Sequence, residues 1–179
     1  MEAKYDGLWK AEADAGRIRL WGEVERENAG IIAAVLAKLD ADKNTKGATL
    51  YINSNGGNGY AMWALTDAIR GAHFEITTVV EGFAASAACI IAAAGQVRKA
   101  RPNSQFLFHG ASHYIGWEKS REATQDAEWA SAFDEQMVVF MAEQTRKPRA
   151  FWRKAIRDSA ELRFTVADAL EWGVIHAVL

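Results

Sequence analysis

The sequence is poor in the residues that form disulfides and metal sites. It contains one cysteine, Cys89, and four histidines among 179 residues. A single cysteine excludes an internal disulfide and gives no metal-ligand cluster. His113 follows His109 by four residues, but a strand followed by a loop is expected there rather than the helix that such a zinc pair needs. We therefore expect no metal and no other cofactor.

The sequence also has little net charge and no apolar segment of membrane-spanning quality. Its 21 basic and 23 acidic residues give a formal net charge of -2, whereas nucleic-acid binding requires a basic surface. The alanine-rich segment Gly82–Val97 carries no charge, but it is too short and too weakly apolar to cross a bilayer. The amino-terminal residues lack the basic start and apolar core of a signal peptide. These features predict a soluble, cytoplasmic protein with no nucleic-acid or membrane partner.

What is present is the composition of an ordinary globular domain. Half of the residues are apolar and a quarter are charged, which suits one domain with a single core. Residues 1–16 are mostly polar and are expected to form a short, loosely held arm. Residues 17–179 are expected to form the domain itself.

Strand-like and helix-like patterns alternate along this domain. Strands are expected at residues 17–21, 48–53, 75–80, 105–108, 162–165 and 174–179. Helices are expected at residues 28–39, 60–70, 87–95, 118–145, 149–157 and 166–172. Asn28 is the expected N-cap of the first of these helices. The alternation predicts an α/β fold with a largely parallel sheet.

Three features in a fixed order carry the chemistry. A glycine-rich turn at Gly56 and Gly57 follows one strand, Ser86 follows a tight turn between a strand and a helix, and His109 follows a third strand. A serine hydroxyl becomes a useful nucleophile when a neutral imidazole takes its proton. A helix N-terminus offers unpaired amides to a developing oxyanion. Each feature alone is commonly structural, but the three together predict an acyl-transfer site with Ser86 as nucleophile and His109 as base.

Four segments also share their amino-acid patterns with a known family. They are Tyr51–Gly57 (Tyr-Ile-Asn-Ser-Asn-Gly-Gly), Gly82–Ser86 (Gly-Phe-Ala-Ala-Ser), Pro102–His109 and Arg163–Val174. From about Arg17 to the carboxyl terminus the chain resembles the proteolytic subunit of the Clp protease, with Asn55 in place of that family's proline. The same segments are similar to the Clp-type head-maturation proteases of tailed phages.

The resemblance implies a fold and an activity. The fold would be the ClpP/crotonase-like ββα superhelix, a single α/β domain with a long protruding handle helix over about residues 118–145. The activity would be that of a serine endopeptidase that cleaves peptides or unfolded proteins inside a homo-oligomeric chamber of one or two heptameric rings. Carried over residue by residue, it makes Ser86 the nucleophile and His109 the base, with Gly57 and Ala87 supplying the oxyanion-hole amides. The brevity of residues 1–16 weakens the expectation of an ATPase unfoldase partner.

The third member of the catalytic triad departs from the family pattern. Leu162 occupies the position of the family's aspartate, and leucine cannot orient an imidazole. Glu161 and Asp158 are the nearby acids, and Glu161 is slightly favoured. A Ser-His dyad, with both carboxylates serving only as surface groups, is also open. Two further functions compete with the peptidase: a catalytically impaired ring subunit, and, ranked last, an acyl-CoA enzyme on the same fold.

Overall fold

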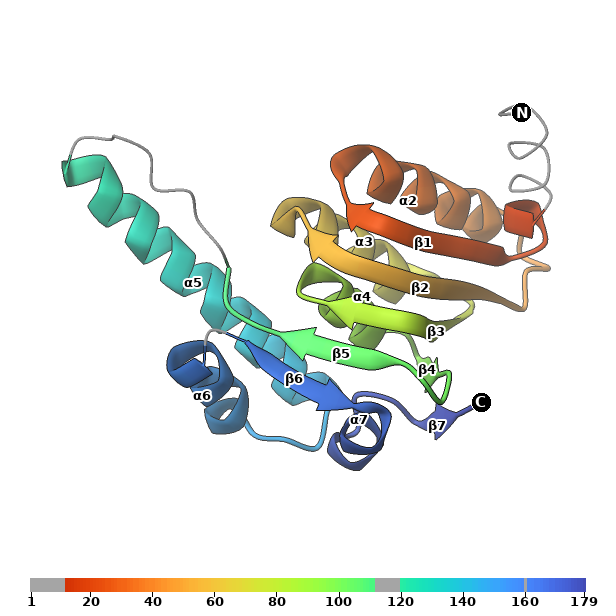
Figure 1. Cartoon of the computed structure of the whole chain (residues 1–179). Helices are drawn as coiled ribbons and strands as arrows, with labels where there is room; N and C mark the ends of the chain where they lie inside the picture. The colour runs from red at the N-terminus through yellow and green to blue at the C-terminus, as the bar shows by residue number, and fades with distance from the viewer. Residues whose placement is uncertain (1–11, 112–119, 160) are drawn as a thin grey trace.

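The computed structural model describes residues 12–111, 120–159 and 161–179 of the chain (Figure 1). The elements follow in the order β1 (Arg17–Val24), α2 (Arg26–Ala41), β2 (Gly47–Gly57), α3 (Gly59–Gly71), β3 (Glu75–Ala85), α4 (Ala87–Ala94), β4 (Val97–Ala100), β5 (Gln105–Phe108), α5 (Ser120–Gln144), α6 (Arg149–Ser159), β6 (Leu162–Thr165), α7 (Val166–Trp172) and β7 (Ala177–Val178). The predicted α/β class is confirmed.

The sheet divides at β3. Its main path runs β1-β2-β3-β4-β7, and every pair along it is parallel. The first part of β3, Thr77–Val80, pairs with β4, whereas its last part, Phe83–Ala85, pairs in parallel with β5. β6 then joins β5 antiparallel. The sheet is thus largely parallel, as predicted, with β5–β6 as the exception among the described strands.

Helices cover the sheet on the side where its apolar residues are buried. Figure 1 shows α2, α3 and α4 together on one face. All eight residues of α4 are buried, because small alanine side chains allow this helix to lie close to the strands and to its neighbouring helices. The wholly buried strand residues Ile18, Leu50, Ile52 and Ile76 complete the core beneath these helices.

The long helix α5 extends away from the body of the molecule (Figure 1). Its expected apolar face is buried toward the carboxyl-terminal end, at Phe133, Met137, Phe140 and Met141. Trp129, nearer the projecting end, is 44% exposed. The apolar face therefore contributes to the core over its last three turns and to a more open surface before them. Across the described residues, no helix combines the length and hydropathy that a membrane span requires.

Two expectations about local structure were wrong. The N-cap of α2 is Glu25 rather than Asn28, and Asn28 instead accepts a hydrogen bond from the Glu25 amide at 2.9 Å as the other half of a capping box. The glycine-rich segments at the ends of β2 and β3 are not turns but continuations of the strands. The end of β2 pairs with β1, and the end of β3 pairs with β5, so neighbouring strands satisfy their backbone groups.

The ends of the described chain also differ from expectation. β4 was not anticipated, and the closing strand is confined to Ala177–Val178. Residues 12–16 pack against the body, with Ala13 buried and Asp14 accepting a hydrogen bond from Lys38 of α2 at 2.5 Å. The division at residue 16 between an arm and a domain stays a prediction, because residues 1–11 lie outside the described part.

Candidate active site

The carboxyl ends of β2, β3 and β5 meet at one edge of the sheet because these strands run parallel as neighbours. Ser54 of β2 pairs with Ala84 of β3, and Ala85 pairs with Leu107 of β5. The pairing continues one residue further, where the Ser86 amide donates to the Leu107 carbonyl at 2.8 Å. The residues that follow these strand ends are therefore brought together, and such edges are where open α/β sheets bind ligands.

Ser86 has a backbone conformation that is unusual for a residue with a side chain. Its φ of 55° and ψ of -123° make it the only non-glycine residue with positive φ in the described chain. Such a conformation costs of order 1–3 kcal/mol and persists where surrounding structure enforces it, often at functional sites. The Ser86 side chain makes no capping hydrogen bond to α4, so the common structural role of a serine at a helix start does not account for it.

Gly56 packs directly against the turn that carries Ser86. A Cβ atom at Gly56 would lie 2.6 Å from the Ala85 carbonyl oxygen, 2.7 Å from the Ser86 Cβ and 3.0 Å from the Ala87 amide nitrogen. Its φ of 93° is itself unfavourable for any other residue. The glycine thus allows β2 to approach the Ser86 turn more closely than a side chain would permit.

We predict that Gly56→Ala lowers the free energy of unfolding by about 2–4 kcal/mol, from overpacking against backbone together with the unfavourable φ. Urea denaturation measures the change. Gly30→Ala in α2 is the matched control, because a Cβ there meets no atom within 4 Å and alanine favours a helix by about 1 kcal/mol. Equal stability of the Gly56 and Gly30 variants would contradict the close approach at Gly56.

A pocket of about 470 Å³ opens at this strand edge. Its lining includes four residues predicted from the sequence: Gly57, Ser86, Ala87 and His109. The structure therefore brings both predicted reactive side chains and both predicted amide donors to one cavity. Within the described residues, no hydrogen bond yet joins the Ser86 hydroxyl to the His109 imidazole. Such contacts are often long before substrate binds.

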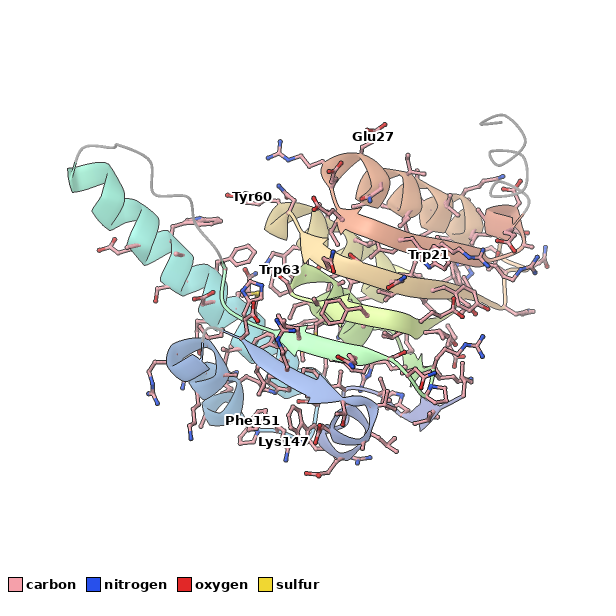
Figure 2. The ribbon with its side chains drawn as sticks, viewed as in Figure 1. Trp21, Glu27, Tyr60, Trp63, Lys147 and Phe151 are labelled. Carbon is pink, nitrogen blue, oxygen red and sulfur yellow. The ribbon has the colours of Figure 1, made fainter. Side chains whose placement is uncertain are left out.

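Aromatic side chains from α3 and α5 form the far wall of the pocket. Tyr60 lies on the side of α3 that faces α5 (Figure 2) and is 58% exposed. Its ring centroid lies 5.5 Å from that of Trp129 and 6.5 Å from that of Phe133. Phe133 lies directly over Gly59, where a Cβ would come within 2.5 Å of its ring. One side of the pocket is thus polar and carries Ser86, while the other is apolar and partly open.

The structure does not bring Glu161, the favoured third carboxylate, to the pocket. Leu162, the position that the resemblance assigns to the family's aspartate, pairs with Phe108 across β5 and β6. Glu161 is half exposed, and its Oε2 accepts hydrogen bonds from the Arg163 Nη2 at 2.7 Å and Nε at 3.2 Å. Glu161 is not part of the pocket lining. The Asp158 side chain lies outside the described part of the structure, so that assignment stays a prediction.

Asp134 is a residue at the site that sequence reasoning missed. It lies on α5, and its Oδ1 accepts a hydrogen bond from the Ala111 amide at 2.7 Å, two residues beyond His109. It is separated from His109 by 25 positions in sequence, so no local motif joins them. The one available signal was its place beside Phe133, on the part of the predicted helix that carries the apolar face.

Other reactive groups near the site have structural explanations. Cys89 in α4 is fully buried, and burial raises the pKa of its thiol to about 12, so it stays protonated at neutral pH. The prediction of a small buried residue at position 89 is confirmed. Among the described residues, no group of three His, Cys, Asp or Glu side chains is placed to hold a metal ion. His113 lies outside those residues.

Comparison with known proteins identifies the family. The sequence model of the Clp protease family matches residues 2–179. The chain belongs to the Clp protease family. Its fold is accordingly the ClpP-like fold, and the resemblance drawn from the four sequence segments is confirmed.

Curated members of the Clp protease family align over most of the chain. The ATP-dependent Clp protease proteolytic subunit of Streptococcus uberis is 30% identical over 177 residues, which cover 90% of this chain and 83% of the relative. The corresponding subunit of Streptococcus mutans is 36% identical over 145 residues, covering 80% and 67%. Proteolytic subunit 1 of Rhodococcus jostii is 38% identical over 149 residues, covering 81% and 64%.

Proposed function

We propose that this chain is a serine endopeptidase of the Clp type, with Ser86 as nucleophile and His109 as general base. The observation that carries the proposal is the strained backbone at Ser86, the one non-glycine residue of the described chain with positive φ, in a pocket that His109 also lines. A strained serine at a sharp strand-to-helix turn presents its hydroxyl outward, as in other serine hydrolases. Membership of the Clp protease family supports the same assignment.

The proposed reaction proceeds in two steps. The Ser86 Oγ attacks the peptide carbonyl while the His109 imidazole takes its proton, and the imidazolium then gives that proton to the leaving amine. Water, deprotonated by the same imidazole, hydrolyses the resulting acyl-enzyme and regenerates Ser86. The amides of Gly57 and Ala87 are proposed to bind the oxyanion. Ala87 is the first residue of α4, where an amide has no partner within the helix and the helix dipole favours negative charge.

The proposed substrates are extended peptides or unfolded proteins. The pocket is open and has an apolar wall of Tyr60, Trp129 and Phe133, which suits a side chain of an unfolded segment more than a small charged molecule. We also propose assembly into a homo-oligomeric ring, supported by the family and by the projecting helix α5. The relatives are named ATP-dependent proteases. The hydrolysis step proposed for this pocket itself needs no ATPase.

A fluorophosphonate probe tests the proposal directly. Incubated with the assembled protein at neutral pH, it is expected to label one residue, and peptide mass spectrometry is expected to locate the label on Ser86. Ser86→Ala should abolish labelling and His109→Ala should slow it strongly, because the hydroxyl loses its base. Absence of labelling in an assembled, folded sample would refute the peptidase.

A ring subunit without activity is the second candidate, and Leu162 is the observation that favours it. If Leu162 occupies the family's aspartate position, as the resemblance implies, that position offers the imidazole no acceptor. The two candidates differ in one measurement, hydrolysis of an unstructured fluorogenic peptide by the purified chain alone. Turnover that disappears in Ser86→Ala supports the peptidase, whereas no turnover by a correctly assembled ring supports the inactive subunit.

A further inference from the structure

A carboxylate from the long helix α5 meets the backbone that leaves His109. The Asp134 Oδ1 accepts a hydrogen bond from the Ala111 amide at 2.7 Å. Its Oδ2 lies 3.0 Å from the position that a Cβ would occupy at Gly110. His109, Gly110 and Ala111 all line the pocket that holds Ser86. Asp134 therefore fastens the segment that carries the proposed base.

The interaction is specific rather than incidental. A hydrogen bond between an ionised carboxylate and a backbone amide is shorter and stronger than one between neutral groups. Asp134 is half-buried beside the buried Phe133, so water screens the bond less than it would on an open surface. Gly110 permits the approach, because a Cβ there would also lie 2.8 Å from the Ile156 Cγ2 of α6. The segment after His109 is thus held between α5 and α6.

Neither Leu162 nor Glu161 gives His109 a carboxylate acceptor in the described structure. Leu162 is apolar, and the Glu161 carboxylate is bound to Arg163. A general base still needs a fixed orientation, since a displacement of about 1 Å at a reacting group can cost 10²-fold in rate. Among the described residues, the carboxylate bonded to the histidine segment is that of Asp134.

We propose that Asp134 is a positioning residue for His109: by accepting the Ala111 amide, it fixes the backbone from which the imidazole reaches Ser86. The inference rests on the proposed function. It assigns to the handle helix α5 a part of the orienting work that the triad aspartate performs elsewhere. Asp134 acts through the backbone and does not touch the reacting atoms.

Three variants test the inference in the full-length, assembled protein. Asp134→Ala removes the acceptor while keeping a good helix former in α5, and kcat for a fluorogenic peptide is expected to fall roughly 10- to 100-fold with KM nearly unchanged. Asp134→Asn keeps an oxygen that can accept the same bond and is expected to restore most of kcat. Glu143→Ala removes an exposed carboxylate from the same helix and is the matched control, expected to behave as wild type. Thermal melting and sedimentation establish that each variant folds and assembles.

The rate of fluorophosphonate labelling distinguishes failure of the proposed peptidase function from failure of the positioning role of Asp134. If the wild-type protein is not labelled at Ser86, the proposed function fails. If the wild type is labelled and Asp134→Ala is labelled and turns over equally fast, only the positioning role fails. An Asp134→Asn variant as slow as Asp134→Ala would also overturn it, because the hydrogen bond would then not be the cause. If Asp134→Ala does not assemble, Asp134→Ser replaces it, because the shorter serine side chain also lacks the hydrogen bond to the Ala111 amide.

Discussion

Ser86→Ala is expected to lower kcat/KM for an unstructured peptide by about 10⁴- to 10⁶-fold, the scale at which loss of a serine nucleophile acts in other serine peptidases. The remaining rate would come from the Gly57 and Ala87 amides and from substrate binding in the pocket. A stopped fluorogenic assay with enzyme in excess measures rates this low. A variant within tenfold of wild type would exclude Ser86 as the nucleophile.

Ser86→Gly separates the chemistry of this position from its backbone strain. Both variants lack the hydroxyl, but glycine adopts a φ of 55° without the cost that any Cβ imposes. The relieved strain of 1–3 kcal/mol exceeds the entropic cost of glycine, so we expect Ser86→Gly to be about 1 kcal/mol more stable than Ser86→Ala. That difference corresponds to roughly 2–4 °C in Tm for a chain of this size. A lower Tm for the glycine variant would show that the turn is not strained.

The regular elements were predictable because their patterns are local. The apolar spacing in residues 28–39 and the alternation in residues 17–21 depend only on which side chains face the core. The strand ends were not predictable in this way. Glycines at positions 56, 57 and 82 suggest turns, yet pairing with β1 and β5 extends both strands through them. Tertiary pairing overrides the local preference of glycine.

The site residues likewise fall into those that the local sequence predicts and those that depend on tertiary contacts. Ser86 and His109 follow β3 and β5 directly and the two glycines end β2, so their order along the chain and the parallel sheet bring them together. The third carboxylate does not follow from order. Glu161 was favoured because it adjoins Leu162, but its carboxylate accepts hydrogen bonds from Arg163 instead. Asp134 reaches the histidine segment only because α5 packs there, and that contact exists in three dimensions alone.

Arg98 lies in β4, the strand that the sequence did not predict, and we expect its loss to destabilise the protein strongly. The strand is short, and its Val-Arg-Lys-Ala sequence suggests an exposed segment, whereas the structure buries Arg98 to 7% exposure. Its guanidinium donates to backbone carbonyls of Val174 (3.0 Å), Gln144 (2.7 Å), Gly173 (2.9 Å), Ala93 (3.4 Å) and Gly95 (3.5 Å). These carbonyls lie at or near the carboxyl ends of α4, α5 and α7, where helix dipoles favour a cation.

We expect Arg98→Ala to lower the free energy of unfolding by about 3–5 kcal/mol, because several buried carbonyls would lose their donor at once. Burial lowers the pKa of Arg98, and the nearby Arg70 lowers it further, but a guanidinium stays charged at neutral pH. The wild-type network is therefore intact under ordinary assay conditions. Thermal melting should show a drop in Tm of about 10 °C.

Two further substitutions identify the cause of that loss. Arg101→Ala removes an exposed arginine whose Nη2 lies 3.2 Å from Glu81, and a surface pair of this kind is worth less than about 1 kcal/mol. Arg98→Lys keeps the charge but not the planar fork that serves several acceptors, so its stability should fall between wild type and Arg98→Ala. If Arg98→Ala melts no lower than Arg101→Ala, the buried guanidinium does not join the three helix ends. If Arg98→Lys matches wild type, the charge alone is sufficient and the fork geometry contributes nothing.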